Sequence, residues 1–246
     1  MRSVCFFMVY HGRPELTKMS IDDMDMAMHQ FSKRGFQVSS IVIGDSYEIS
    51  MFCAERGIQH EMFKNDPVSD KFTYAWLRAI QKRCDYICWY GSNNVHSPGY
   101  WDVAMNRLEG NKVVTLGTRN CIIMSSDESE EWGCLFNPTP GYLISSGQFF
   151  LTSTLINTVN ILTLYHERQK FNFDGLILDR LTEKWGNEIV EVISFDEEDC
   201  VDVKNNQNIH SFESYMNQPH YERYHTKKMV GRHPCLSHYM SGFYAS

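Results

Sequence analysis

Short apolar runs and longer segments with helical periodicity alternate along the first part of the chain. The run Val4–Tyr10 is rich in β-branched and aromatic residues and is followed by Gly12 and Pro14, as expected of a strand buried on both faces. After it, apolar residues recur at roughly helical spacing from Met19 to Phe31. By the same reasoning we predict strands at 3–10, 38–43, 59–63 and 85–90, and helices at 19–31, 51–54 and 72–83.

Capping signals suggest where the first helix begins and ends. Ser20 with Asp23 resembles a capping box, and Gly35 stands where a C-cap is expected. Strands that alternate with helices at this spacing indicate βαβ units with right-handed crossovers. We therefore predict an α/β fold with a mainly parallel mixed sheet flanked by helices.

The pattern continues less regularly through the rest of the chain. We expect a main domain at 1–190 and a C-terminal extension at 191–246, which would serve as a lid or an acceptor-binding tail. The remaining parts of the chain are apolar stretches at 113–116 and 121–124, a segment at 138–147, a predicted long helix at 151–168, a predicted helix at 176–185 and a predicted strand at 189–193.

In a parallel sheet, ligands bind where the strands end and the loops open onto a crevice. That rule selects the segments at 10–13, 44–46 and 91–94, together with the start of the helix around Lys71.

Composition agrees with a folded protein that has one substantial core. The chain has 246 residues, of which 43% are hydrophobic and 22% charged, so global disorder is not expected. The apolar run at 4–10 is too short for a signal peptide or a membrane span. The eight cysteines lack paired Cys-x-x-Cys spacing, which indicates reduced thiols in a cytoplasmic protein rather than a zinc site.

The charge distribution argues against a surface that grips nucleic acid throughout. The net charge is −7, whereas phosphate contacts need many Lys and Arg side chains. The segment 219–238 is an exception, because it holds Arg223, Lys227, Lys228 and Arg232 against a lone Glu222. A polyanionic ligand is expected to meet this basic tail, although such a run can equally be a solvated loop.

Two enzyme classes lack their signatures. A dinucleotide-binding oxidoreductase or methyltransferase needs a glycine-rich turn after the first strand, and here Gly12 is followed by Arg13 and Pro14. A serine hydrolase of the α/β type needs a Gly-x-Ser-x-Gly elbow, and none occurs in the sequence.

The segment that ends the fourth strand, Trp89-Tyr90-Gly91-Ser92-Asn93-Asn94, is the most informative one. The order of elements and this motif together resemble the GT-A glycosyltransferases, particularly small bacteriophage enzymes of that fold. In those relatives the fourth strand carries a polar, usually acidic motif, often Gly-Ser-Asp-Asp, that contacts the sugar nucleotide and its divalent metal.

The resemblance extends over most of the chain and implies further roles. Tyr10–Arg13 resembles the first nucleotide-contacting loop, and Lys71 the basic position before the third helix. Gly147 and Gln148, within 141–148, are similar to an acceptor-side loop. Asp174 and Asp179 lie in a segment resembling the catalytic helix region, and 201–204 with 208–210 resembles a strand and turn near the end of the phage proteins.

One departure from the family concerns the metal. Asn93 and Asn94 stand where the relatives have carboxylates, and a neutral amide is a poor ligand for Mg²⁺ or Mn²⁺. The leaving diphosphate still needs a positive neighbour. Either a metal is held by Asn94 with Asp202 or a C-terminal His, or the chain binds a nucleotide without turnover, or basic side chains replace the metal. We favour the last, with candidates at Lys71, Arg119, Lys227, Lys228 and Arg232.

Transfer to a hydroxyl by an inverting enzyme needs a general base, and a carboxylate is the usual choice. Asp174 and Asp179 are five residues apart, so on one helix they point roughly 140° apart and only one can face the cleft. We choose Asp179; Asp174 is the alternative base and is also a candidate N-cap.

Several polar and aromatic residues allow both a functional and a structural reading. Tyr10 either stacks on the nucleobase or belongs to the core, and Asp45 either accepts hydrogen bonds from the base or ribose or caps the next helix. The aromatic residues after the fourth strand, His96, Tyr100 and Trp101, are expected to pack on the core.

The leading hypothesis is a glycosyltransferase that takes a sugar from a nucleoside diphosphate sugar such as a UDP-sugar. By resemblance to the phage enzymes, its acceptor is a hydroxymethylated pyrimidine in DNA, reached through the basic tail. The alternative, motivated by Asn93 and Asn94, is a catalytically silent nucleotide-sugar-binding module.

Overall fold

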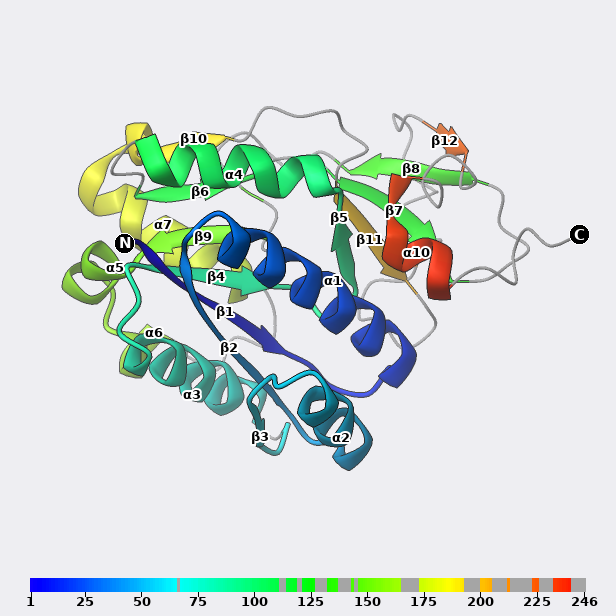
Figure 1. Ribbon diagram of the computed structural model, residues 1–246. Helices are drawn as coiled ribbons and strands as arrows, with labels where there is room; N and C mark the ends of the chain where they lie inside the picture. The colour runs from blue at the N-terminus through cyan, green and yellow to red at the C-terminus, as the bar shows by residue number, and fades with distance from the viewer. Residues whose placement is uncertain are drawn as a thin grey trace, which may run out of the picture.

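The computed structural model describes residues 1–65, 67–110, 114–118, 121–126, 132–136, 143, 146–164, 173–192, 200–204, 212, 223–225 and 232–239. These residues form a seven-stranded and a five-stranded β-sheet with helices packed against them (Figure 1).

The larger sheet is built around the first strand. β1 (Ser3–Val9) pairs in parallel with β2 (Gln37–Gly44) on one side and with β4 (Tyr86–Tyr90) on the other. β3 (His60–Met62) pairs in parallel with β2. The predicted parallel βαβ arrangement of the first part of the chain is confirmed, and the strands end on a common edge.

The other side of this sheet is mixed. β9 (Gln148–Leu151) runs antiparallel to both β4 and β6 (Thr115–Gly117), and β10 (Val190–Val192) pairs in parallel with β6. The complete order is β10-β6-β9-β4-β1-β2-β3. The fold class is therefore the predicted one: α/β, with a mainly parallel mixed sheet.

Helices cover both faces of the larger sheet because successive strand residues point to opposite sides. Phe6 and Met8 pack with the first set of helices, and Cys5 and Phe7 with the second. The first set is α1 (Pro14–Lys33), α2 (Tyr47–Glu55) and α4 (Pro98–Gly110); the second is α3 (Val68–Gln81), α5 (Thr152–Thr158), α6 (Ile161–Leu164) and α7 (Phe173–Trp185), which leads into the 3-10 turn η1 (Asn187–Ile189) (Figure 1).

The smaller sheet adjoins the end of β4. Its order is β12-β8-β7-β11-β5, formed by β12 (Arg223–His225), β8 (Trp132–Phe136), β7 (Cys121–Ser125), β11 (Cys200–Lys204) and β5 (Asn94–His96). β11 is antiparallel to β5 and parallel to β7. α10 (Pro234–Tyr239) packs against α1 and one face of this sheet. The described residues from 190 onward thus supply β10 to the larger sheet, and β11 and β12 to the smaller one.

The first helix begins earlier than its capping signals suggest. α1 starts at Pro14, with Arg13 as its N-cap, so the predicted start at Ser20 is wrong. Pro14 is pre-organised for the first turn of a helix, where its missing N–H has no intrahelical partner to lose. Asp23 lies inside the helix, where it accepts a hydrogen bond from Tyr90 and another from the His96 N–H at 2.8 Å. Gly35 follows the helix with φ of 91°, as predicted for a C-terminal cap.

The predicted long helix at 151–168 is interrupted. The structure has α5 and α6 in its place, separated by Val159 and Asn160. Val159 adopts an extended conformation, with φ −109° and ψ 120°. Val159 is buried in the apolar layer on the α3 side of the sheet, so the side-chain packing favours the break.

The eight cysteines are all free and buried. Among the described residues, none of the helices combines the length and the apolar character that crossing a bilayer requires.

Candidate functional site

The loop between β1 and α1 places a cation at the carboxyl edge of the larger sheet. Gly12 and Arg13 both have positive φ, 59° and 52°, a conformation that is uncommon for a residue with a side chain. Arg13 makes no capping hydrogen bond to the helix that it precedes. Its side chain instead donates from Nη2 to Ser92 Oγ at 3.2 Å.

The turn after β4 receives this contact and is largely buried. Ser92, Asn93 and Asn94 are 5%, 9% and 6% exposed. Asn93 Nδ2 donates to Asp202 Oδ1 at 2.5 Å and to the Val203 carbonyl at 2.9 Å. The sequence-predicted residues Arg13, Ser92, Asn93 and Asn94 are therefore brought together at the end of β4.

β11 adds a carboxylate and a second cation to the group. Asp202 lies opposite Asn94 in the pairing of β5 with β11. Its Oδ2 is 2.8 Å from Lys204 Nζ, and both side chains are mostly buried. Burial lowers the pKa of Arg13, and the negative charge of Asp202 opposes that shift. We call Arg13, Ser92, Asn93, Asp202 and Lys204 the Arg13 cluster.

The donor set of this cluster does not fit a divalent metal. Both oxygens of Asp202 already have partners: Oδ1 accepts a hydrogen bond from Asn93, and Oδ2 forms an ion pair with Lys204. A divalent cation would have to displace both partners. In the part of the chain that the structure describes, no group of three or more His, Cys, Asp and Glu side chains is arranged to hold a metal ion. Mg²⁺ and Mn²⁺ favour carboxylate and water oxygens.

Tyr10 and Lys71 are buried beneath the loop. The Tyr10 side chain is 2% exposed, and its hydroxyl is 2.9 Å from His60 Nε2 and 3.0 Å from the Ser46 nitrogen. The core reading of Tyr10 is thus the one the structure supports. Lys71 is fully buried and donates from Nζ to the Tyr10 carbonyl at 2.9 Å. Burial lowers the pKa of Lys71, with Asp45 opposing the shift.

Asp45 ends β2 beside the same loop and pairs with His11, whose Nδ1 is 2.9 Å from Asp45 Oδ2. The imidazole is 60% exposed and the carboxylate 30%, so the pair borders solvent. The alternative role of Asp45 as a helix cap falls to Ser46, which accepts a hydrogen bond from the Ile49 nitrogen. Asp45 is therefore available to an external ligand.

The proposed acceptor-side residues are buried at the start of β9. The Gly147 nitrogen donates to the Trp89 carbonyl at 2.8 Å, and the Tyr100 hydroxyl donates to the Gly147 carbonyl at 2.8 Å. Gln148 is 1% exposed, and its Nε2 has no hydrogen-bond partner among the described residues. His96, Tyr100 and Trp101 pack together in the core, as predicted.

The two candidate bases both lie on α7. The helix begins at Phe173, so Asp174 occupies its first turn and is not the N-cap; its side chain lies outside the described part of the structure. Asp179 is an exposed residue. Partial desolvation of its carboxylate raises its pKa, and the negative charge of Glu183 adds to the effect. No hydrogen bond or ion pair among the described residues joins Asp179 to the Arg13 cluster.

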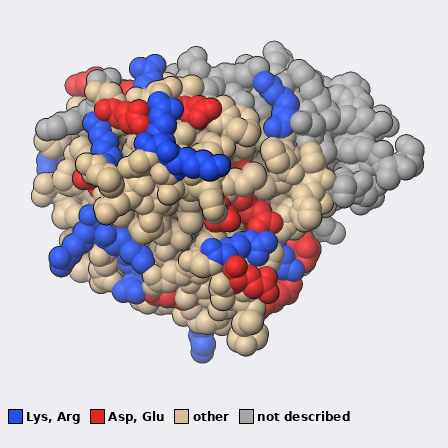
Figure 2. Space-filling view, in the orientation of Figure 1, with Lys and Arg blue, Asp and Glu red and all other residues tan. Residues whose placement is uncertain are grey.

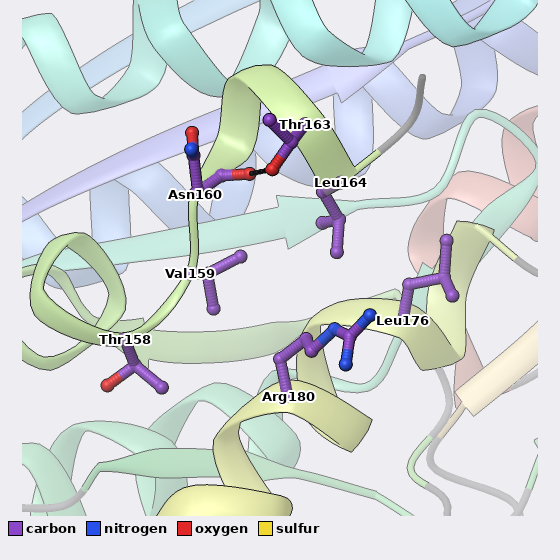
Figure 3. A pocket seen from close by; sticks show the side chains of 7 residues that line it. All are labelled: Thr158, Val159, Asn160, Thr163, Leu164, Leu176 and Arg180. Carbon is purple, nitrogen blue, oxygen red and sulfur yellow. Dashed lines mark hydrogen bonds between the residues drawn. The ribbon is translucent and has the colours of Figure 1, made fainter. Parts of the chain in front are cut away.

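A pocket of about 280 Å³ lies on the α7 side of the sheet, and Asp179 is not one of its lining residues. Arg180 extends into it from α7, opposite residues of α5, α6 and the link between them (Figure 3). A second pocket, of about 410 Å³, lies between α1, β2 and the end of α2. The Arg13 cluster contributes to neither. The lining of the first pocket is Thr158, Val159, Asn160, Thr163, Leu164, Leu176 and Arg180.

In the basic tail, Lys227 and Lys228 lie outside the described residues, and Arg232 directly precedes His233 and α10. Arg119, another candidate cation, also lies outside the described residues. On the face that carries α1 and α4, Lys and Arg side chains lie among Asp and Glu side chains (Figure 2). The described part of that face therefore has mixed charge.

Sequence reasoning identified Asp202 and the loop 10–13, which contains His11, but assigned no role to Lys204. The alternation Val201-Asp202-Val203-Lys204 is a usable signal, because it puts the two charged side chains on the same face of one strand. That β11 lies beside the β4–β5 turn depends on pairing between distant segments, which the local pattern does not reveal.

Comparison with known proteins supports the fold. No protein-family model matches the chain, and no curated protein matches it. Among solved structures, 4-diphosphocytidyl-2C-methyl-D-erythritol synthase from Anaerococcus prevotii DSM 20548 is similar, with a TM-score of 0.53 at 12% identity, over 88% of this chain and 99% of that one. S. aureus TarS 1-349 in complex with UDP gives a TM-score of 0.49 at 10% identity, over 82% of this chain and 60% of that one. The chain therefore shares the overall α/β fold of the Anaerococcus prevotii protein.

Proposed function

We propose that the protein is a transferase that binds a nucleoside diphosphate sugar at the carboxyl ends of β1, β2 and β4. The observation that carries the proposal is the Arg13 guanidinium, held at this edge by Ser92. A guanidinium has a planar fork of donors that matches phosphate oxygens, and ligands of open α/β sheets bind at this edge. The reaction proposed is transfer of the sugar to a hydroxyl acceptor.

The start of α1 supports binding of phosphate at the same place. The Arg13 side chain makes no capping hydrogen bond to the first turn of α1. The backbone N–H groups of that turn are therefore left for a ligand. An anion there is stabilised by those donors and by the helix dipole. Asp45 and His11, at the end of β2 and in the β1–α1 loop, are proposed to bind the ribose or base; Tyr10 and Lys71 support the loop from below.

The acceptor side is proposed at the start of β9 and on α7. The amide nitrogen of Gln148, which has no partner among the described residues, offers a donor on β9. This strand pairs with β4, which leads into the turn at Ser92–Asn94. Asp179 is proposed as the general base that removes the acceptor's proton, with Asp174 as the alternative. A raised pKa suits this role, because efficient bases titrate near the working pH.

The acceptor itself is proposed to be a hydroxymethylated pyrimidine in DNA, by the resemblance to phage enzymes. Lys227, Lys228 and Arg232 would then contact the DNA phosphates. A hydroxyl of another molecule remains compatible with the same donor site, so the assay has to test donor and acceptor separately.

The test is a panel of nucleoside diphosphate sugars, incubated with the protein with and without hydroxymethylated DNA. Released nucleoside diphosphate with sugar in the DNA is the expected result. The same panel with nucleoside triphosphates and sugar phosphates examines nucleotidyl transfer, which would release inorganic diphosphate. Production of inorganic diphosphate alone would replace the glycosyl-transfer proposal.

A second candidate function is a nucleotide-sugar-binding module without turnover. It is favoured by Asn93 and Asn94, which stand in place of the carboxylates of the enzymes that the chain resembles, and by the commitment of the Asn93 amide to Asp202 and Val203. Binding of a nucleotide sugar by calorimetry, with no product under any condition, would select this candidate.

A further inference from the structure

Arg13 retains hydrogen-bonding capacity that its neighbours do not use. A guanidinium carries five N–H donors. Within the described residues, the hydrogen-bond partner of this group is Ser92, a neutral hydroxyl. The carboxylate that influences its pKa is Asp202, which acts through its charge; within the described structure no hydrogen bond joins the two side chains. Arg13 thus presents a partly buried positive charge toward the end of β4.

Asp202 is kept from neutralising Arg13 by two other partners. Lys204 Nζ is 2.8 Å from one carboxylate oxygen, and Asn93 Nδ2 is hydrogen-bonded to the other. Lys204 and Asn93 thus hold the two oxygens of Asp202, and Arg13 keeps donors that can meet another anion.

The orientation of the Asn93 amide excludes joint metal coordination with Asp202. Its nitrogen lies between two acceptors, Asp202 Oδ1 and the Val203 carbonyl, so the N–H groups must point that way. Turning the amide to offer its oxygen to a cation beside Asp202 would put oxygen against the Val203 carbonyl. A metal bound by both side chains would break both hydrogen bonds.

We propose that Arg13 takes the place of a divalent metal in binding the diphosphate of the donor, with Lys204 as a positioning residue that holds Asp202 away from it. The inference rests on the proposed function. In the reaction, the bond between the anomeric carbon and the diphosphate oxygen breaks, and its electron pair stays on the diphosphate. The acceptor oxygen bonds to the anomeric carbon and its proton passes to a base. Arg13 stabilises the charge that develops on the leaving diphosphate.

The experiment measures binding of two probes, inorganic diphosphate and UDP, by calorimetry in EDTA and in Mn²⁺. Each probe is expected to bind with the same affinity in EDTA as in Mn²⁺. Arg13→Gln should weaken binding by about tenfold or more, because a charge-assisted hydrogen bond is lost. Lys204→Met should also weaken it, since Asp202 is then free to pair with Arg13. Lys18→Met is the control, because Lys18 lies near the start of α1 but pairs with Glu15 and Glu48. The Lys18→Met variant should bind both probes within about twofold of the unchanged protein.

The outcomes separate this inference from the function on which it rests. Binding of UDP that EDTA abolishes and Mn²⁺ restores would overturn the role of Arg13 and leave the nucleotide site standing. Binding of inorganic diphosphate without any nucleotide would keep the Arg13 site and remove the proposed function, and failure of both probes in both buffers would remove both. If Arg13→Gln or Lys204→Met does not fold, Arg13→Lys and Lys204→Arg, which keep the charges, should retain EDTA-resistant binding; loss of binding in folded forms of both would overturn the inference.

Discussion

Lys71 Nζ donates a hydrogen bond to the backbone carbonyl of Tyr10 at 2.9 Å, in a site from which solvent is excluded. The contact ties α3 to the end of β1, just before the loop that carries Arg13. A buried ammonium with a neutral acceptor is costly unless its pKa falls, and burial lowers the pKa of Lys71.

This relationship predicts a pH-dependent effect of Lys71→Met. Below the folded pKa of Lys71 both states hold the proton, so the buried charge weighs fully against the native state. Between that pKa and the ordinary value of 10.5, the unfolded state binds more protons, and stability rises with pH. The free energy of unfolding of the unchanged protein, minus that of Lys71→Met, should therefore increase as pH rises toward 10.5.

Urea unfolding from pH 7 to pH 10 measures this difference. Lys18→Met is the matched control, because its carboxylate partners raise the pKa of Lys18 and give no such increase below 10.5. A difference that stays constant for Lys71→Met would mean that the ammonium is solvated in the native protein.

Gly147 predicts a strong effect of a single methyl group. It has φ of 72°, and a Cβ there would lie 2.8 Å from His96 Nε2 and 3.0 Å from the Tyr100 ring. Gly147→Ala is expected to lower the free energy of unfolding by about 1–3 kcal/mol or more, from backbone strain and overpacking. Gly110→Ala, where nothing lies within 4 Å of the new Cβ, should change it by less than about 1 kcal/mol. Equal stability of the two variants in urea would contradict the packing.

The sequence predicted the first part of the fold well because its strands are buried on both faces. Continuous apolar runs such as Val4–Tyr10 separated by helical periodicity leave few alternatives to parallel βαβ units. The start of α1 was misplaced because the N-cap is Arg13, a residue that rarely caps helices or adopts positive φ. Pro14, a frequent first residue of helices, was the usable signal.

In the candidate site, the residues at the ends of parallel strands are predictable from the sequence, whereas the contribution of Lys204 is not. Arg13 and Ser92–Asn94 follow strands of the parallel sheet, and the rule that strand ends carry the site finds them. Lys204 reaches them through β11, whose pairing with β5 and β7 joins segments far apart in the sequence. Such pairing depends on the whole tertiary structure, and no local pattern specifies it.

Asn93→Asp should make the protein respond to a divalent cation. The change removes the amide donors to Asp202 and Val203 and sets a second carboxylate against Asp202. In EDTA it should destabilise the fold by about 1–3 kcal/mol, because hydrogen bonds are lost and like charges meet. Mn²⁺ should restore part of the melting temperature in Asn93→Asp and leave the unchanged protein unaffected. Asn93→Ala loses the same donors without adding charge and is the control. An identical response to Mn²⁺ in both variants would mean that this turn does not bind the cation.

Asp179→Asn should abolish transfer while nucleotide affinity stays within about threefold, since the carboxylate acts on the acceptor and not on the phosphates. Initial rates and calorimetric Kd values for the nucleotide separate the two effects. Asp174→Asn, on the same helix, is the comparison. If this variant alone abolishes transfer, Asp174 is the base. Loss of rate and of nucleotide binding to the same degree in Asp179→Asn would point to a structural role on α7.

Charge reversal at Lys227 and Lys228 tests whether the basic tail meets the acceptor. With both changed to Glu, affinity for hydroxymethylated duplex DNA should fall about tenfold or more near 0.1 M salt, and the dependence of affinity on salt should become shallower, because fewer counterions are released on binding. The control reverses Lys33 and Lys64, two exposed lysines, and alters the net charge equally. Fluorescence anisotropy over a salt series measures both. If the two double variants lose affinity alike, net charge and not the tail governs DNA binding; if neither loses any, DNA is not the acceptor that this tail contacts.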